Sequence, residues 1–285
     1  MPFLVLLVLA FAPGVFWLWF FVRKDVYRPE PRRLLIATFA LGAAVTIPVA
    51  LVEVVFLGES MLSDEVTLGP LAVAMLLVVG PAEELGKFAV VRFVPYRSLY
   101  FDEPMDGLVY GAAASLGFAS LENLAYMVAL GPAVILARGP ISTLGHLVLS
   151  SIWAYPLGLR SQSKSGMGLP VAAGLAIAAM AHGIFNIMVF SAPLVALAMV
   201  ALGAVWTMSR FNWAQRVSPF RYRRNYPLVR CEVCQRQVRV TSLYCRFCGS
   251  PAEARPEALY CGNCKGRNRP DASYCTACGD KLLIR

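Results

Sequence analysis

The 285-residue sequence has few charged residues, which make up 15% of the chain against 58% hydrophobic residues. Soluble domains carry about 25% charged residues, so this composition excludes a disordered chain and argues against an ordinary soluble domain. The chain holds only two histidines and no H-E-x-x-H motif, the usual signature of a helical zinc protease. No cysteine precedes position 231, so the eight cysteines belong to a module separate from the apolar part.

The formal net charge of +9 is unevenly distributed along the chain. Residues 1–208 hold 11 Lys and Arg against 12 Asp and Glu, a net charge of −1. Residues 209–285 hold 15 against 5, a net charge of +10. The positive charge therefore belongs to the C-terminal tail, and the long apolar runs before it predict a polytopic membrane protein.

Seven apolar segments reach or approach the about 20 helical residues that a bilayer requires. No basic residue precedes the first segment, and its apolar run continues to Val22, which favours a retained helix over a cleaved signal peptide. The predicted spans are residues 2–22, 34–57, 67–94, 106–130, 140–159, 168–190 and 192–208. We expect an all-α membrane domain over 1–208, a basic linker over 209–230, and small β-rich zinc ribbons at 231–249 and 261–279.

Lys and Arg concentrate in alternate loops, which predicts the orientation of the chain. The opposite loops carry Arg138 alone, and the loop 58–66 is acidic. By the positive-inside rule, the N-terminus lies outside and the tail lies in the cytoplasm, in what we expect to be a bacterial cell membrane. The basic loop residues are Arg23, Lys24, Arg28, Arg32, Arg33, Arg92, Arg97, Arg160 and Lys164.

The linker 209–230 mixes arginine with tryptophan, phenylalanine and tyrosine. This composition favours an anchor to anionic lipid, because each basic residue near such a surface contributes about 1 kcal/mol. A nucleic-acid contact is the alternative.

The cysteines form an internal repeat with a period of 30 residues. Each set reads C-x2-C-x10-C-x2-C, and the sets are Cys231, Cys234, Cys245, Cys248 and Cys261, Cys264, Cys275, Cys278. Four thiolates spaced in this way suit a tetrahedral Zn²⁺ site, and a reducing cytoplasmic location disfavours the alternative of a disulfide framework. We expect two structural zinc ions, with a cytoplasmic protein or a nucleic acid as the candidate partner of the ribbons.

Ionisable residues inside transmembrane helices are costly and usually functional. The third span contains Glu83, Glu84 and Lys87, and the fourth contains Glu122 next to Asn123. The two histidines, His146 and His182, lie in the fifth and sixth spans. We interpret Glu53, near the end of the second span, as interfacial.

The spacing of the acidic pair suggests an acid–base function. Glu83 and Glu84 lie four and three residues before Lys87, so either carboxylate reaches the ammonium group along one helix face. We expect Lys87 to neutralise one carboxylate and leave the other to deprotonate water and later protonate a leaving amine. Pro81 is expected to kink the third span just before the pair.

The histidines have polar neighbours one helical turn away. Ser150 follows His146 at i,i+4, and Asn186 follows His182 at the same distance. Two histidines that face a carboxylate can orient water and donate hydrogen bonds to a tetrahedral oxyanion. Three alternatives stay open at this point: a purely structural polar network, a metal site of Glu and two His, and an ion or proton pathway.

Four ordered motifs within about residues 30–190 resemble the PrsW intramembrane proteases, which are related to the CAAX prenyl proteases and the bacteriocin-immunity proteins. They are Glu83-Glu84-x-x-Lys87, Asp106-Gly107 followed by Gly-Phe118-Ala-x-x-Glu122-Asn123, Gly145-His146-x-x-x-Ser150, and His182-Gly183. The resemblance implies a helical membrane peptidase of the glutamic type, whose paired glutamates activate water without an active-site metal. A metal-dependent variant stays open.

The resemblance also assigns roles and a substrate class. It implies that Glu83 and Glu84 are the catalytic pair and that His182, His146 and Glu122 assist them, with Phe118 and the other motif residues in support. Single-span membrane proteins such as anti-sigma factors are the implied substrates, and prenylated or peptide substrates are related options. In this sequence the final motif ends in Asn186, so an acidic partner for His182 is missing.

The predicted spans separate Glu83 from Glu122 by more than about 10 Å in membrane depth, at a rise of 1.5 Å per residue. Longer tilted helices over 67–95 and 108–137 would bring both near the midplane. The favoured hypothesis is therefore a seven-span intramembrane endopeptidase. A non-proteolytic scaffold that recruits a partner through the ribbons, and a proton- or ion-linked transporter, are the alternatives.

Overall fold

The computed structural model describes residues 2–61, 68–98, 100–161, 168–218, 220, 228–239, 245, 247–251, 259–264, 267–268, 275 and 280. The chain divides into two compact units, Met1–Ser218 and Pro219–Arg285. Three charges used for the topology prediction, Asp64, Glu65 and Lys164, lie outside the described residues.

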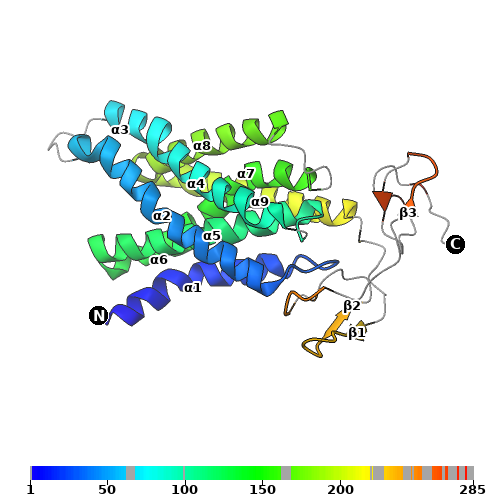
Figure 1. Cartoon of the computed structure of the whole chain (residues 1–285). Helices are drawn as coiled ribbons and strands as arrows, with labels where there is room; N and C mark the ends of the chain where they lie inside the picture. Colours follow the sequence, from blue (N-terminus) through cyan, green and yellow to red (C-terminus); the bar gives the residue numbers. More distant parts are fainter. Residues whose placement is uncertain are drawn as a thin grey trace. The chain divides into compact units, whose positions relative to one another are not determined.

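The first unit is a bundle of helices in which α5 lies in the middle and packs against α1, α2 and α7 (Figure 1). The α-helices are α1 Phe3–Val22, α2 Arg32–Met61, α3 Leu68–Ala74, α4 Gly80–Phe93, α5 Pro104–Leu130, α6 Ile135–Ala137, α7 Thr143–Leu159, α8 Gly168–Ser191 and α9 Pro193–Val217. The 3₁₀ segments are η2 Pro95–Arg97 and η3 Pro132–Val134, and the π-helical segments are η1 Met75–Val79 and η4 Arg138–Ser142.

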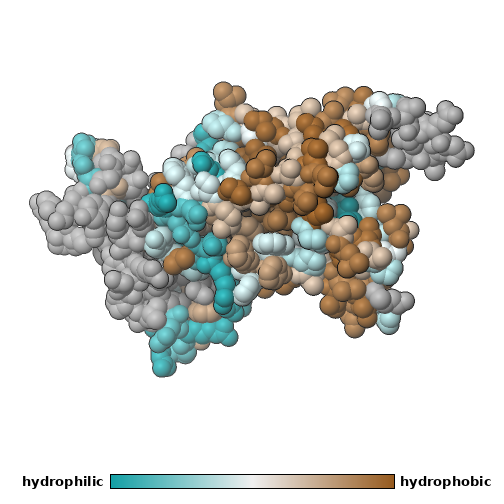
Figure 2. Space-filling view, turned by 180° about the vertical axis from the view of Figure 1, so that it is seen from behind, coloured by the Kyte–Doolittle hydropathy of each residue, from teal (hydrophilic) through white to brown (hydrophobic). Residues whose placement is uncertain are grey.

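The outer surface of this bundle is apolar. Val55 and Leu194, for example, keep 78% and 81% of their surface exposed. Figure 2 shows that hydrophobic side chains dominate the visible face of the helical unit. Such a surface is costly in water and favourable in lipid, which confirms an integral membrane protein. Six segments of the described residues are long and apolar enough to span a membrane: Phe3–Val22, Arg32–Leu57, Pro104–Leu130, Pro132–Leu159, Gly168–Ser191 and Pro193–Val217.

The third predicted span is the exception, because it is not one regular helix. A π-helical segment, η1, separates α3 from α4, and the amide of Gly80 donates to the carbonyl of Met75 five residues earlier. Pro81 follows directly and has no amide hydrogen, so regular i→i−4 bonding cannot continue through it. The predicted kink is therefore accommodated as a wider turn, a feature that often marks functional sites.

A second π-helical segment, η4, comes just before α7, so the helix that carries His146 is approached by an irregular turn as well. The preceding helix, α5, ends at Leu130, where the predicted span 106–130 ends, and the longer alternative to residue 137 does not form. Gly131 adopts a φ of 92° and Pro132 follows it, a combination that ends a helix efficiently. Farther along, α9 continues past residue 208 to Val217, so the start of the predicted linker is helical.

Buried carboxylates hold the N-terminus of α5. Glu103 and Asp106 form a capping box there, and the Ser218 hydroxyl at the end of α9 donates to Glu103. The Tyr110 hydroxyl donates to Glu30 in the α1–α2 loop. Burial raises the pKa of both Glu30 and Glu103 well above the usual range. These contacts fix the loop and the end of α9 against the central helix.

The second unit contains two short antiparallel strand pairs. Strand β1 (Leu228–Arg230) pairs with β2 (Gln237–Arg239), and β3 (Leu259–Tyr260) pairs with β4 (Arg267–Asn268). Each pair encloses the first Cys-x-x-Cys of one cysteine set. The hairpins thus present two thiols of each set on a tight turn.

Candidate active site

Helix α4 places Glu83, Glu84 and Lys87 inside the bundle, where the lysine is fully buried. The Lys87 Nζ atom lies 3.1 Å from Glu83 Oε2, 2.9 Å from Glu84 Oε1 and 2.9 Å from His146 Nδ1. An ammonium group has three hydrogens, and each has an acceptor here. Lys87 therefore contacts both carboxylates, rather than one as the sequence suggested.

Glu84 is held by donors from two other helices. Ser150 Oγ and Trp153 Nε1, both on α7, donate to Glu84 Oε2 at 2.9 and 2.8 Å. His182 Nδ1 on α8 lies 2.8 Å from Glu84 Oε1. The acidic partner that the final motif lacks is thus supplied by Glu84, 98 residues earlier in the chain. With both oxygens engaged and no exposed surface, Glu84 is suited to positioning rather than to attack on a substrate.

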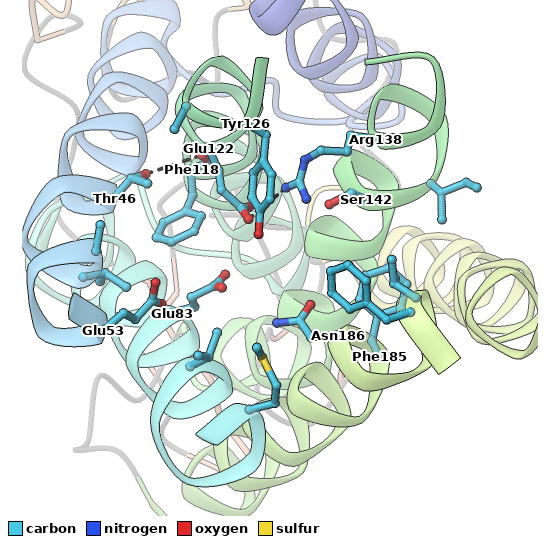
Figure 3. Close-up of a pocket in the computed structure, with 18 of the residues that line it drawn as sticks. Thr46, Glu53, Glu83, Phe118, Glu122, Tyr126, Arg138, Ser142, Phe185 and Asn186 are labelled. Carbon is cyan, nitrogen blue, oxygen red and sulfur yellow. Dashed lines mark hydrogen bonds and ion pairs between the residues drawn. The ribbon is translucent and has the colours of Figure 1, made fainter. Parts of the chain in front are cut away.

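Glu83, by contrast, lines a cavity of about 510 Å³ (Figure 3). Most of the lining is apolar and comes from α2, α4, α5, α8 and η4. The figure shows Glu53, Glu83 and Asn186 pointing toward the same space from three helices. Glu53, which we expected at the membrane interface, is therefore part of the cavity wall. The polar lining residues are Thr46, Glu53, Glu83, Glu122, Tyr126, Arg138, Ser142 and Asn186.

The two histidines lie against each other beside Glu83, with ring centroids 5.0 Å apart. His146 Nδ1 lies 3.6 Å from Glu83 Oε2, and His182 Nε2 lies 3.5 Å from the same oxygen. On its other side, His146 Nε2 contacts Glu122 Oε2 at 2.8 Å. His146 thus bridges Glu83 and Glu122, which brings together residues that the predicted spans had separated in depth.

Since Lys87 donates to Nδ1 of His146, the hydrogen of a neutral ring lies on Nε2 and points to Glu122. Arg138 Nη2 contacts the other oxygen of Glu122 at 2.8 Å. Arg138 Nε also donates to Asn123 Oδ1 at 3.1 Å, and Asn123 donates to Thr143. A chain of polar contacts therefore runs from η4 through Glu122 to His146.

Sequence reasoning missed Arg138 and Trp153 as members of the site. Arg138 entered only as a loop charge in the topology prediction, because its π-helical segment was expected to be a connection. Trp153 lies one turn after Ser150 on α7, so the i,i+3 spacing was the signal that could have found it. Phe118 was predicted, and its ring lies 4.4 Å from Lys87 Nζ, in cation–π contact.

Close helix contacts allow His182 to reach the glutamates. A Cβ atom on Gly80 would lie 2.3 Å from the Ala179 carbonyl oxygen, and one on Gly183 would lie 2.5 Å from that of Met75. Both positions therefore require glycine for α8 to cross α4 and η1 at this distance. The crossing brings His182 next to the acidic pair.

A divalent metal is suggested by three donor atoms from Glu83, His146 and His182, which all lie within 4.8 Å of one another. Their types match a catalytic zinc set, and separations of 3.5 and 3.6 Å resemble the edge of about 3.3 Å in a tetrahedral site. However, the Lys87 ammonium lies within 3.1 Å of two of these donors and takes the His146 lone pair. With Lys87 in this position, the arrangement does not fit a metal ion.

The tail holds a second set of candidate ligands. Cys231, Cys234, Cys245 and Cys248 lie within 4.8 Å of one another, as do Cys261, Cys264 and Cys275. The contacts between neighbouring sulfurs are 3.4 to 3.7 Å, too long for the about 2.05 Å of a disulfide. A hydrogen bond from Ser250 lowers the pKa of the Cys231 thiol to about 6, which favours the thiolate that zinc binds. Cys278 lies outside the described residues.

Comparisons with known proteins agree on one family. Residues 30–211 match the profile described as PrsW family intramembrane metalloprotease. The PrsW protease of Geobacillus kaustophilus is 35% identical over 147 residues, which is 52% of this chain and 63% of that protein. The corresponding protease of Bacillus subtilis is 33% identical over 52% of this chain and 65% of its own length. The PrsW protease of Halalkalibacterium halodurans is 29% identical over 64% of this chain and 81% of its own length.

The matched segment thus spans slightly less than two thirds of the Geobacillus and Bacillus proteins. No solved structure matches the chain. The profile match covers the helices that carry the site residues of the helical unit. It ends before the cysteine sets of the tail.

Proposed function

Because the chain belongs to the PrsW family of intramembrane metalloproteases, we propose that it is an intramembrane endopeptidase in which Glu83 activates water. The observation that carries this proposal is the division of labour within the acidic pair. Glu83 faces a cavity in the membrane domain, whereas Glu84 is tied to Lys87, His182, Ser150 and Trp153. One carboxylate is thus available to a substrate, and the other holds the site together.

In the proposed mechanism, Glu83 accepts a proton from a water molecule as its oxygen attacks the peptide carbonyl carbon. The same carboxyl group then gives that proton to the departing amine, so no net proton is consumed at Glu83. The buried Lys87 ammonium contacts Glu83 and holds this carboxyl group in place for the attack. The apolar walls of the cavity exclude bulk water, which strengthens these interactions.

We assign oxyanion stabilisation to Asn186. Its amide points into the cavity from α8, one turn beyond His182 (Figure 3). A preorganised amide donor of this kind stabilises the negative charge that develops on the carbonyl oxygen. His146, held between Lys87 and Glu122, positions the lysine and Glu83, and His182 couples the two glutamates.

The substrate class that we propose is a single-span membrane protein. The cavity is lined by residues near the C-terminal ends of α2, α5 and α8. With the orientation that the loop charges predict, these ends lie in the outer half of the membrane. The scissile bond is then expected near the outer surface.

A comparison of membrane-proteome fragments tests this function directly. Cells that express the native chain are compared with cells that express the Glu83→Ala/Glu84→Ala double variant at matched protein levels. We expect peptides with new termini within or beside single transmembrane segments only with the native chain. Identical fragment sets from both chains would reject the protease assignment.

The position of Lys87 predicts that cleavage does not require an active-site metal. A chelator such as 1,10-phenanthroline is expected to change the initial rate of the purified chain by less than about twofold, because no donor lone pair of His146 is free. Zinc content measured in parallel shows whether the tail ions have been removed. The decisive control is a Cys231→Ser/Cys261→Ser chain, which lacks ligands of both tail sites. If the chelator inactivates this chain and added zinc restores its activity, the prediction is wrong and the metal is assigned to Glu83, His146 and His182.

For the tail we propose two zinc ribbons with structural ions, in which Cys278 completes the second set. Each hairpin supplies one Cys-x-x-Cys, and the sulfur contacts of 3.4 to 3.7 Å fit the edges of a ZnS₄ tetrahedron.

Because such small modules fold only with metal, Cys245→Ser is expected to remove one equivalent of zinc and unfold one ribbon. Metal analysis checks the stoichiometry. Val233→Ala, at a position with 71% of its surface exposed, is the control outside the ligand set. Unchanged zinc content in Cys245→Ser would contradict the assignment.

A further inference from the structure

The cavity wall contains one carboxylate that the proposed mechanism does not use. Glu53 lies on α2, next to Glu83 of α4, and its side chain points into the cavity (Figure 3). Its Oε1 atom is buried and has no hydrogen-bond partner among the described residues. Oxygens of this kind are uncommon in folded proteins, because an unmatched buried acceptor is costly.

The other carboxylates of the cavity differ from Glu53 in their contacts with basic side chains. Glu83 contacts Lys87, and Glu122 contacts both Arg138 and His146. The charges that act most strongly on Glu53 are those of Glu83 and Glu122, which have the same sign as its own. Lys87 offsets these like charges only in part, and among the acidic groups of the described cavity wall Glu53 is the one without an ion pair to a basic side chain.

We propose that Glu53 forms a substrate subsite that binds an N–H donor next to the scissile bond. This inference rests on the proposed protease function, because the occupant of the cavity is taken to be the substrate segment. The charge balance favours a lysine or arginine side chain, which supplies both the donor and the missing positive charge. A backbone amide of the substrate shares the donor chemistry but supplies no charge.

The cavity suits such a side chain in shape as well as in charge. The residues around Glu53 on α2 are Val49, Ala50, Val54 and Leu57, and all of them line the cavity. The methylene groups of a lysine can pack along this apolar surface while its ammonium reaches the carboxylate. Within a membrane segment, a basic residue gains more from such a partner than it does in water.

The experiment uses the full chain in liposomes with a set of single-span model substrates. The substrates share one hydrophobic segment and carry either lysine or leucine at a single position, which is scanned through the segment. Products are identified by mass spectrometry for the native chain, Glu53→Gln, Glu53→Leu and Val52→Leu. Val52 lies on the same helix with 42% of its surface exposed and serves as the matched control. Glu53→Gln keeps the shape of the side chain, so it tests the subsite even if Glu53→Leu folds poorly.

We expect a preference for lysine at one fixed distance from the cleaved bond. There, the native chain and Val52→Leu should cleave the lysine substrate about 10- to 100-fold faster than its leucine partner. This rate ratio corresponds to the free energy of a hydrogen bond to a charged group. Glu53→Leu should abolish this preference and Glu53→Gln should weaken it, with leucine substrates cleaved at near-native rates. A uniform slowing of every substrate in both Glu53 variants would assign the donor to the backbone amide.

Two outcomes overturn the proposal, and they are distinguishable. If the native chain cleaves the set and Glu53→Leu retains the same preferences and rates, the Glu53 subsite is wrong while the protease function stands. If the native chain is no more active on the set than a Glu83→Gln control, the proposed function fails and the subsite fails with it.

Discussion

Replacement of Glu83 by glutamine is expected to lower kcat by about 10²- to 10⁴-fold, the contribution that general acid–base catalysis usually makes. Glutamine has the same shape and can still accept a hydrogen bond from Lys87, but it cannot take a proton from water. The KM for a single-span substrate should change little, because the cavity walls are unaltered. Initial rates in liposomes, measured over a range of substrate density, separate the two parameters.

The neighbouring positions on α4 supply the controls for this result. Leu85 has 53% of its surface exposed on the lipid-facing side, so Leu85→Ala should retain near-native activity. Glu84→Gln should lose stability as well as activity, because it removes the charge that faces Lys87 and His182. Two results would reverse the roles proposed for the pair. One is a Glu83→Gln chain with normal turnover. The other is a Glu84→Gln chain that stays folded while Glu83→Gln unfolds.

The sequence was sufficient to predict the membrane class and most spans, because both depend on composition and segment length. It was also sufficient to bring Glu83, Glu84, Lys87 and both histidines into one candidate site, since ionisable residues in lipid are rare and usually belong to a functional site. The tail cysteines were predicted from spacing alone. The clustering of the described cysteines follows from short-range geometry, which a repeated motif encodes directly.

What could not be predicted depends on contacts between distant helices. The bond between His182 and Glu84 joins residues 98 positions apart, and no local pattern reports it. Arg138 was assigned to a loop because a π-helical segment has no recognisable hydrophobic period. The prediction for Glu53 concerned only its depth, near the end of a span, and that distance does not report the rotation of α2 that turns the side chain toward the cavity.

Lys87 is the residue whose replacement is expected to destabilise the fold most. Lys87→Met removes the cation that contacts both Glu83 and Glu84, and it leaves these adjacent carboxylates buried without its compensation. Breaking a buried ion pair in this way costs about 3–5 kcal/mol in the free energy of unfolding. Unfolding followed by helical circular dichroism, in mixed micelles of increasing denaturing detergent, measures the change.

A double variant distinguishes charge compensation from simple packing around Lys87. Adding Glu84→Gln to Lys87→Met removes one of the two uncompensated charges, so the double variant should be more stable than Lys87→Met alone, with a coupling energy of about 0.5–3 kcal/mol. Activity should not return, because Glu83 would still lack its cation. If the double variant is instead less stable than the native chain by the sum of the two single effects, the coupling energy is zero. Lys87 then acts through packing against Phe118 and not through the acidic pair.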